Sequence, residues 1–223
     1  HGPRLVSRET SLTDFEPEPA FAATVFGGQL NLARAYAAQL AERGETLGLI
    51  GPLEPARLWT RHIVNCGLLA PLLVAGARVG DVGSGAGLPG LVLALTRPDV
   101  SFVLIEPMER RAEWLLNQID ILGLTNAAVL RARGEDCLGL NLDVVTARAV
   151  SALRTLIPVT APLVKPGGEL ILMKGASAAN EIATAAKQIA RFKLRDVRVQ
   201  ELGGAELGEV TWVVRAKVDG LAR

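Results

Sequence analysis

The sequence has few of the residues that build disulfide frameworks or metal centres. Among its 223 residues are two cysteines, Cys66 and Cys137, and two histidines, His1 and His62. Two cysteines without C-x-x-C spacing are too few for a disulfide framework, and the histidines form no cluster of metal ligands. We therefore predict a protein of a reducing, cytoplasmic compartment that binds no metal.

Long apolar runs and an excess of one charge are also absent. The longest apolar run, Cys66 to Ala75, is interrupted by Pro71 and is far shorter than the roughly 20 residues of a membrane-spanning helix. The formal net charge is +1, so no overall basic excess indicates a nucleic-acid-binding protein. The hydrophobic fraction of 49% is typical of a globular protein with a sizeable core. No pattern indicates a subunit interface, and we expect a monomer without membrane contact.

Hydropathy patterns divide the chain into three segments. Residues 1–20 are polar and contain Pro17 and Pro19, which predicts a flexible lead-in. Apolar residues then recur at helical spacing, which predicts an N-terminal helical extension over residues 21–75. From residue 76 to 223 short apolar strands alternate with helices, which predicts one α/β domain.

The second helix of the extension is predicted over residues 54–69 and is amphipathic. Its inward stripe consists of Trp59, Ile63, Cys66 and Ala70. Arg61, His62 and Asn65 lie on its polar face, because residues three and four apart share one side of an α-helix. For His62 the alternative is a histidine that packs between helices, and it is not expected to be a catalytic base.

A glycine-rich segment, VGDVGSGAGLPG, begins at Val79 at the end of a predicted strand. An acid, Asp81, precedes alternating glycines at Gly83, Gly85 and Gly87. Glycine allows a tight turn and lets a ligand lie against the backbone without a Cβ in the way. The dinucleotide fingerprint G-x-G-x-x-G needs its third glycine where Leu88 stands, so the match is to the acid-x-G-x-G-x-G loop for S-adenosylmethionine. We expect residues 84–87 to lie under the amino acid part of this cofactor, with their amides free to donate.

The order of elements after residue 76 supports this interpretation. Strands are predicted at 77–82, 102–106, 127–130, 142–148, 169–173, 194–202 and 210–218. Strands that alternate with helices imply a parallel sheet, and the last two strands, around Gly203-Gly204, add an antiparallel hairpin. This is the order of a class I methyltransferase, whereas a dinucleotide-binding domain normally lacks the hairpin. We predict a Rossmann-like, mostly parallel seven-stranded sheet with a terminal β-hairpin and a short N-terminal helical extension.

Three strand ends supply further candidate residues, because ligands of open α/β sheets bind at the carboxyl ends of the strands. Glu106 follows the second strand, where a carboxylate can accept bonds from both ribose hydroxyls, although a solvated loop acid is the alternative. Glu135 follows the third strand within reach of an adenine ring, or else belongs to an ordinary polar turn. Arg148 ends the fourth strand and faces the reaction centre, unless it forms a structural ion pair.

The surroundings of the fourth strand exclude two chemistries. Methylation of an exocyclic amino group commonly uses an Asn/Asp-Pro-Pro-aromatic loop, which the residues after Thr146 do not resemble. Methylation of a pyrimidine carbon needs a cysteine nucleophile near the cofactor, and neither Cys66 nor Cys137 is well placed. A target with its own lone pair, such as a ring nitrogen, remains open, because displacement at a sulfonium methyl needs only alignment and charge management.

Taken together, these residues resemble the RsmG family, also called glucose-inhibited division protein B. The matching segments are LWTRHIVN (58–65), DVGSGAGLPG (81–90), RPD (97–99), Glu106 with Arg110-Arg111, RGE (133–135), ARA (147–149) and KG (174–175). The resemblance implies a methyltransferase for 16S rRNA, with residues 76–223 as its S-adenosylmethionine-binding domain. The implied target is N7 of a guanine, guanosine 527, in the 530 loop of the 30S subunit. A methyltransferase acting on another RNA, a protein or a small molecule is the alternative.

The resemblance also implies roles for single residues. It places Gly83, Leu88, Gly134, Glu135 and Arg148 at the cofactor, where Asp81, Ser84, Gly85, Gly87 and Glu106 complete the predicted site. It places Arg61, His62, Asn65 and Lys174 on the RNA side, and we expect Arg110 and Arg111 to join them in a local basic rim. The family usually has alanine where Gly134 stands.

The chemistry of the implied target assigns roles to two cations. Guanine N7 has an exposed lone pair, so no general base is required to create the nucleophile. Because N7 must stay free to attack, Arg148 and Lys174 are expected to act catalytically through contacts with O6 or a phosphate. The base must also leave its stack to reach the methyl group.

Overall fold

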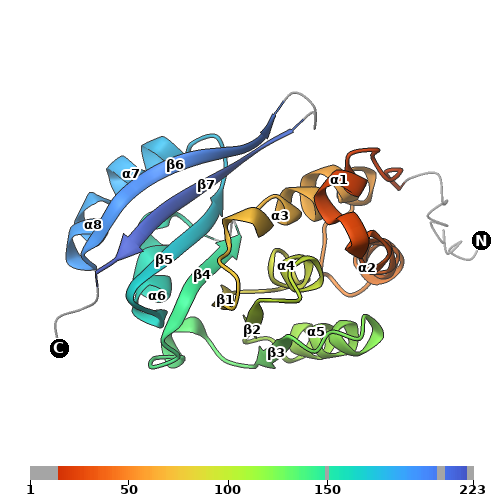
Figure 1. Ribbon diagram of the computed structural model, residues 1–223, viewed down its shortest axis with the longest axis horizontal. Coiled ribbons are helices and arrows are strands. Elements are labelled where there is room, and N and C mark those ends of the chain that lie inside the picture. The colour runs from red at the N-terminus through yellow and green to blue at the C-terminus, as the bar shows by residue number, and fades with distance from the viewer. Residues whose placement is uncertain (1–14, 149–150, 205–208, 220–223) are drawn as a thin grey trace, which may run out of the picture.

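A seven-stranded sheet with the order β3-β2-β1-β4-β5-β7-β6 organises the protein (Figure 1). The computed structural model describes residues 15–148, 151–204 and 209–219. The strands are β1 (Arg78–Val82), β2 (Ser101–Ile105), β3 (Ala127–Leu130), β4 (Leu142–Arg148), β5 (Val164–Lys174), β6 (Leu194–Gly204) and β7 (Glu209–Val218). β1 to β5 pair in parallel, and β7 runs antiparallel to both β5 and β6. The predicted fold, a mostly parallel sheet closed by an antiparallel pair, is confirmed.

Two turns predicted from glycine lie inside strands instead. Gly203 and Gly204 belong to β6, where they pair with Val210 and Glu209, and the connection to β7 falls outside the described residues. Residues 166–168, whose Pro-Gly-Gly sequence predicts a turn, instead form an irregularity within β5, where the register with β4 shifts. Glycine is needed there because the backbone of Gly167 has a φ of +80°.

Helices cover both faces of the sheet, because the buried strands alternate their apolar side chains between the faces. Leu170 and Leu172 pack into one core cluster, and Ile171 and Met173 pack into the other. The first cluster lies under α6 (Leu153–Thr160), α7 (Ala178–Thr184) and α8 (Ala186–Arg191). The second lies under α4 (Gly90–Thr96), α5 (Glu109–Ile121) and the N-terminal helices (Figure 1).

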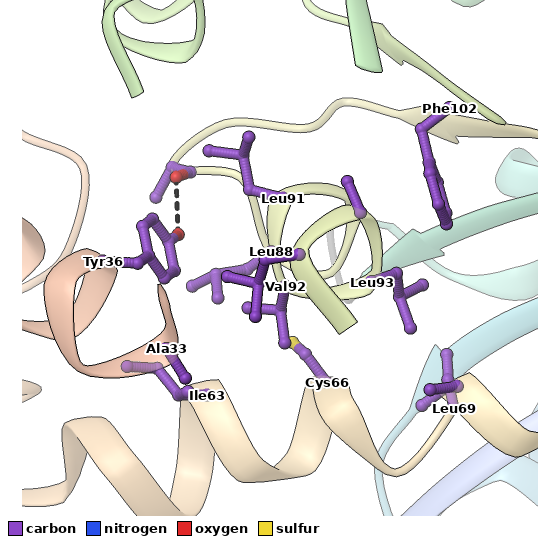
Figure 2. Packing of buried hydrophobic residues seen from close by; sticks show 14 of the residues in the cluster. Ala33, Tyr36, Ile63, Cys66, Leu69, Leu88, Leu91, Val92, Leu93 and Phe102 are labelled. Carbon is purple, nitrogen blue, oxygen red and sulfur yellow. Dashed lines mark hydrogen bonds between the residues drawn. The ribbon is translucent and has the colours of Figure 1, made fainter. Parts of the chain in front are cut away.

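The N-terminal helices form one layer, which contacts α4 through its second and third α-helices. They are α1 (Ala22–Phe26), α2 (Leu30–Arg43) and a continuous helical stretch made of η3 (Pro55–Arg57), η4 (Leu58–Val64) and α3 (Asn65–Gly67). Short 3-10 turns complete the helices at η2 (Gly27–Gln29), η5 (Ala70–Leu72), η6 (Gly134–Asp136) and η7 (Ala161–Leu163). Figure 2 shows Ile63 and Cys66 of this stretch beside Val92 of α4, with Tyr36 of α2 next to them.

The second predicted helix differs from the expected α-helix, because η4 is a π-helix. Its predicted inward stripe is buried, from Trp59 to Ala70. Leu58, His62 and Val64 are buried as well, so the stretch has little exposed polar face. A wider π turn changes which residues share a side, and such turns are frequent at functional sites. Among the described residues, no helix is long and apolar enough to cross a membrane.

Candidate active site

Asp81, at the carboxyl end of β1, holds the glycine loop in place. Its buried Oδ2 atom accepts hydrogen bonds from the Ser84 hydroxyl at 2.6 Å and from the Gly90 amide at 2.8 Å. A Cβ at Gly90 would lie only 2.4 Å from that oxygen, which explains the glycine at the start of α4. Burial raises the pKa of Asp81 to about 6, although the bonds from Ser84 and Gly90 act in the opposite direction. Asp81 therefore positions the loop.

Three of the four backbone amides that were predicted to be free, those of Ser84, Gly85 and Gly87, already donate hydrogen bonds within the protein. Gly83 and Ser84 donate to the Ile105 carbonyl at 2.9 and 3.1 Å. Gly85 donates to Glu106 Oε2 at 2.9 Å, and Gly87 donates to the Ser84 carbonyl at 2.8 Å. Buried backbone donors are almost always paired, and here the acceptors come from the end of β2 and from the loop itself. These hydrogen bonds therefore fix the backbone conformation of the glycine loop.

Two side chains that the sequence did not indicate hold the same loop from outside. The carbonyl of Ala86 accepts a hydrogen bond from the Tyr36 hydroxyl at 2.7 Å and from Trp114 Nε1 at 2.9 Å. Tyr36 comes from α2 and Trp114 from α5; the dashed line in Figure 2 marks the tyrosine bond. Buried tyrosine and tryptophan normally find a partner for their polar atom, but spacing does not indicate which partner.

Glu106 combines burial with spare acceptor capacity. It is 2% exposed and accepts bonds from the amides of Gly85 and Met108, both at 2.9 Å. A carboxylate has about four lone-pair sites, so two remain for other donors. Two ribose hydroxyls beside the glycine loop are donors of the required kind, and Glu106 therefore fits the cofactor that the loop predicts.

The remaining predicted cofactor residues lie around the glycine loop. Gly134 starts η6 after β3, and a Cβ there would lie 2.5 Å from Val159 Cγ1 of α6, so glycine suits this packing. Glu135 is exposed beside it. Leu88 is buried in the core cluster shared with α4, where its side chain anchors the loop. Its amide donates to the Ser84 carbonyl at 3.2 Å.

A cavity of about 370 Å³ opens where the carboxyl ends of β4 and β5 meet β7 and the η4–α3 stretch. Its walls are formed by Arg61, Asn65, Arg148, Met173, Lys174, Gly175, Val210, Thr211 and Trp212. Four predicted residues meet here, from three distant parts of the chain. The sequence does not predict the wall from β7, because the alternating pattern of the hairpin indicates only strands at the sheet edge. Arg110 and Arg111 are not part of this wall and lie at the start of α5.

Lys174 forms part of the cavity wall, and an ion pair with Glu181 balances its charge. Its side chain is 5% exposed, and Nζ lies 2.8 Å from Glu181 Oε2 and 2.7 Å from the Ser151 carbonyl. Glu181 also accepts the Leu153 amide at 2.8 Å, so it joins the ammonium group to the start of α6. Two of the three N–H donors of the ammonium group are used in these contacts.

The family of the chain follows from its sequence match. Residues 29–208 match the family model described as GidB, rRNA small subunit methyltransferase G. The chain belongs to this family. Proteins called ribosomal RNA small subunit methyltransferase G are close in sequence. The protein from Clavibacter michiganensis subsp. michiganensis is 60% identical over 204 residues, which cover 91% of this chain and 96% of that protein. The protein from Leifsonia xyli subsp. xyli is 61% identical, with 91% and 97% covered.

Solved structures of other methyltransferases resemble the fold of this chain. The AdoMet complex of TYW2 from M. jannaschii matches 74% of this chain and 78% of its own, with a TM-score of 0.57 and 20% identity. An S-adenosylmethionine-dependent O-methyltransferase from Thermotoga maritima matches 71% and 66%, with a TM-score of 0.55 and 16% identity. At such identities the likeness concerns the fold, which is that of class I methyltransferases.

In this GidB chain, His62 does not lie on the polar face where the sequence placed it. It is 6% exposed, its Nδ1 faces the Arg148 guanidinium, and its Nε2 faces the Glu54 carboxylate. Burial and the charge of Arg148 lower the pKa of His62 to about 4, although Glu54 acts in the opposite direction. The imidazole is therefore neutral near pH 7 and adds no charge to a basic rim.

Cys66 lies behind the same guanidinium. Its Sγ atom is 3.9 Å from Arg148 Nη1, and the side chain is fully buried. Burial raises the pKa of Cys66 to about 11, even though Arg148 favours the thiolate. The thiolate is the nucleophilic form of cysteine, so this residue stays unreactive at neutral pH. Its environment supports the exclusion of cysteine-based methylation.

Proposed function

We propose that the protein transfers the methyl group of S-adenosylmethionine to N7 of a guanine in 16S rRNA, and that this guanine is guanosine 527 of the 530 loop. The cavity beside the glycine loop carries this proposal, because it combines donor side chains with an aromatic wall. The names of the GidB relatives support small-subunit rRNA as the substrate.

The chemistry of the lining residues suits a target that brings its own lone pair. Arg148 donates hydrogen bonds and does not accept a proton at neutral pH, so it serves as a holder of oxygen atoms. Cys66 remains a thiol, so no nucleophilic cysteine adjoins the cavity. Bound S-adenosylmethionine supplies the electrophilic methyl group. The task of the protein is to orient the base and to exclude water.

Guanine is recognised in this proposal by its O6 edge and its face. Arg148 contacts O6 or the neighbouring phosphate, which leaves N7 free to attack. Trp212, half-buried on the β7 side, offers a surface on which an unstacked base can lie. Arg61, exposed at the rim, and Lys174 are proposed to contact the RNA backbone.

Methyl transfer from labelled S-adenosylmethionine to 30S subunits that lack the modification tests the proposal. The expected result is one methyl group per subunit, mapped to N7 of a single guanine of the 530 loop by cleavage at the alkylated base. Naked 16S rRNA, total protein and tRNA serve as competing acceptors. Intact cofactor binding without incorporation into 16S rRNA would overturn the proposal, as would a label mapped to another atom.

A further inference from the structure

A line of polar side chains connects the N-terminal extension to the end of β4. Its members, in order of contact, are Arg57, Glu54, His62 and Arg148. Arg57 Nη2 donates to Glu54 Oε1 at 2.6 Å, and the other carboxylate oxygen, Oε2, faces His62 Nε2. The opposite ring nitrogen, Nδ1, faces Arg148 Nη2. Only the last residue of this line belongs to the cavity wall.

The partners of the imidazole determine its protonation. A guanidinium only donates, so Nδ1 of His62 must be the acceptor and carry no proton. An ionised carboxylate only accepts, so Nε2 must carry the proton and donate it to Glu54. One neutral tautomer satisfies both contacts, whereas an imidazolium would direct an N–H at the guanidinium.

The charges around the ring favour this state. Arg148 and Arg61 disfavour a charged imidazole, while Glu54 favours it, and burial adds to the arginines. Burial alone would raise the pKa of Glu54, but hydrogen bonds from Arg57 and His62 hold this pKa below its ordinary value. Glu54 is thus the ionised acceptor that the tautomer requires, and Cys66, the other neighbour of Arg148, stays neutral.

We infer that Glu54 and His62 are positioning residues that orient the Arg148 guanidinium toward the substrate base. The inference rests on the function proposed above, because the orientation of Arg148 matters only if a substrate base binds in the cavity. Arginine has five N–H donors in a fixed plane. The contacts with His62 and Cys66 engage Nη2 and Nη1, which fixes the plane of the guanidinium at the cavity wall.

The tautomer is measurable without any RNA. Because His1 and His62 are the only histidines of the chain, a ¹⁵N-histidine-labelled protein yields two imidazole systems, and the His62→Gln variant assigns them. We expect His62 to remain an Nε2–H tautomer from about pH 5.5 to 8. Titration of His62 near its ordinary pKa, or an Nδ1–H tautomer, would overturn the inference. This outcome is independent of whether 16S rRNA is the substrate.

Two variants of Glu54 separate positioning from general structural support. Glu54→Gln keeps an oxygen that accepts the Nε2 proton, and Glu54→Ala removes it. We expect Glu54→Ala to lower kcat by about tenfold or more with little change in KM for 30S subunits, and Glu54→Gln to recover most of that loss.

Glu18→Ala is the matched control. It removes an acid that is paired on the surface with Arg34 of α2, away from the cavity, and it should leave kcat unchanged. Equal kcat values for Glu54→Ala and the unmodified protein would contradict the inference, and so would equal losses for the alanine and glutamine variants. If Glu54→Ala fails to fold, as judged by near-UV circular dichroism, the tautomer measurement still decides.

Discussion

The glycine loop after β1 and the cavity at the ends of β4 and β5 lie on the same edge of the sheet, but they are built over different distances along the chain. The loop is held mainly by residues within one short stretch and the end of the neighbouring strand: Asp81 binds Ser84 and Gly90, and Glu106 binds Gly85. The cavity joins η4, β4, β5 and β7, which are separated by up to about 150 residues.

The local loop and the cavity built from distant elements suit two different functions, which are cofactor binding and substrate handling. A loop stabilised by its own hydrogen bonds forms a rigid surface against which a cofactor can lie. A cavity made from several elements depends on how these elements pack, so its side chains need partners in other parts of the fold. Arg148 is held by His62, and Lys174 by Glu181, each from a different element. Substitutions should therefore affect cofactor binding at the loop and substrate handling at the cavity.

The largest effect is expected for Gly85→Val in the loop. Gly85 has a φ of +57°, which a β-branched residue adopts only with strain, and the new side chain would enter the space proposed for the cofactor. Isothermal titration calorimetry should detect no S-adenosylmethionine binding at concentrations that saturate the unmodified protein. Gly123→Val, at a φ of +62° and with open space beyond α5, is the matched control and should bind normally. Loss of binding in both variants would indicate general destabilisation.

The next largest effect is expected for Arg148→Ala in the cavity. If Arg148 contacts the reacting base as proposed, removal of this donor should lower kcat roughly 100-fold. The affinity for 30S subunits should fall much less, because most RNA affinity comes from phosphate contacts spread over the surface. Single-turnover methyl transfer and filter binding measure the two quantities. Arg131→Ala removes an exposed arginine paired with Glu109 and serves as the control. Equal losses of rate and affinity would place Arg148 outside the reaction centre.

A third substitution tests whether the β7 wall receives a base. Stacking on an aromatic ring contributes about 1–3 kcal/mol per base, so Trp212→Ala should weaken binding to 30S subunits about tenfold. Trp212→Phe retains an aromatic face and should remain near the unmodified affinity. S-adenosylmethionine binding should not change in either variant. A tryptophan that only supports the sheet would instead reduce stability and leave RNA affinity intact.

The fourth prediction concerns the pH dependence of stability. The folded-state pKa of His62, about 4, is lower than its ordinary value of 6.5, so the folded state binds fewer protons between these values. Its contribution to stability is complete above about pH 6.5 and is lost as the pH falls toward 4. Between about pH 7.5 and 5 the protein should lose on the order of 2 kcal/mol more than His62→Gln does.

Urea denaturation at the two pH values measures this difference. The raised pKa of Asp81 acts in the opposite direction, since its contribution falls as the pH rises, but Asp81 is present in both proteins and cancels in the comparison. An identical pH dependence of the two proteins would show that the ring titrates as it does in the unfolded chain.

The smallest effect is expected for Tyr36→Phe, which removes one of the two bonds to the Ala86 carbonyl. Trp114 remains on the same oxygen, so the loss of stability should be about 1 kcal/mol. The Kd for S-adenosylmethionine should rise by about threefold or less, because the loop keeps its internal bonds. Urea denaturation and calorimetry report the two values. No change in stability would mean that the helical extension does not contribute to holding the loop.

Residue patterns along the chain predict the features that are formed by residues close together in the sequence. The alternation of strands and helices predicts the mostly parallel sheet, and β3 and β4 begin and end where the apolar runs do. The acid and the glycines of the loop follow one another within seven residues, so their spacing predicts a tight turn, and the order of strands and helices adds the kind of ligand. The sequence places Arg148 at the carboxyl end of the fourth strand, and the structure adds that this end forms part of the cavity wall.

Only the tertiary structure decided which polar groups are left for substrate. Helical spacing placed His62 beside Arg61 on a polar face, but a π-helix packed between α2, α4 and the sheet buries it against Arg148 and Glu54. Spacing did not indicate Glu181 for Lys174, or Tyr36 and Trp114 for one carbonyl. Periodicity describes how one element turns, whereas pairing across elements depends on the distances that the assembled sheet imposes.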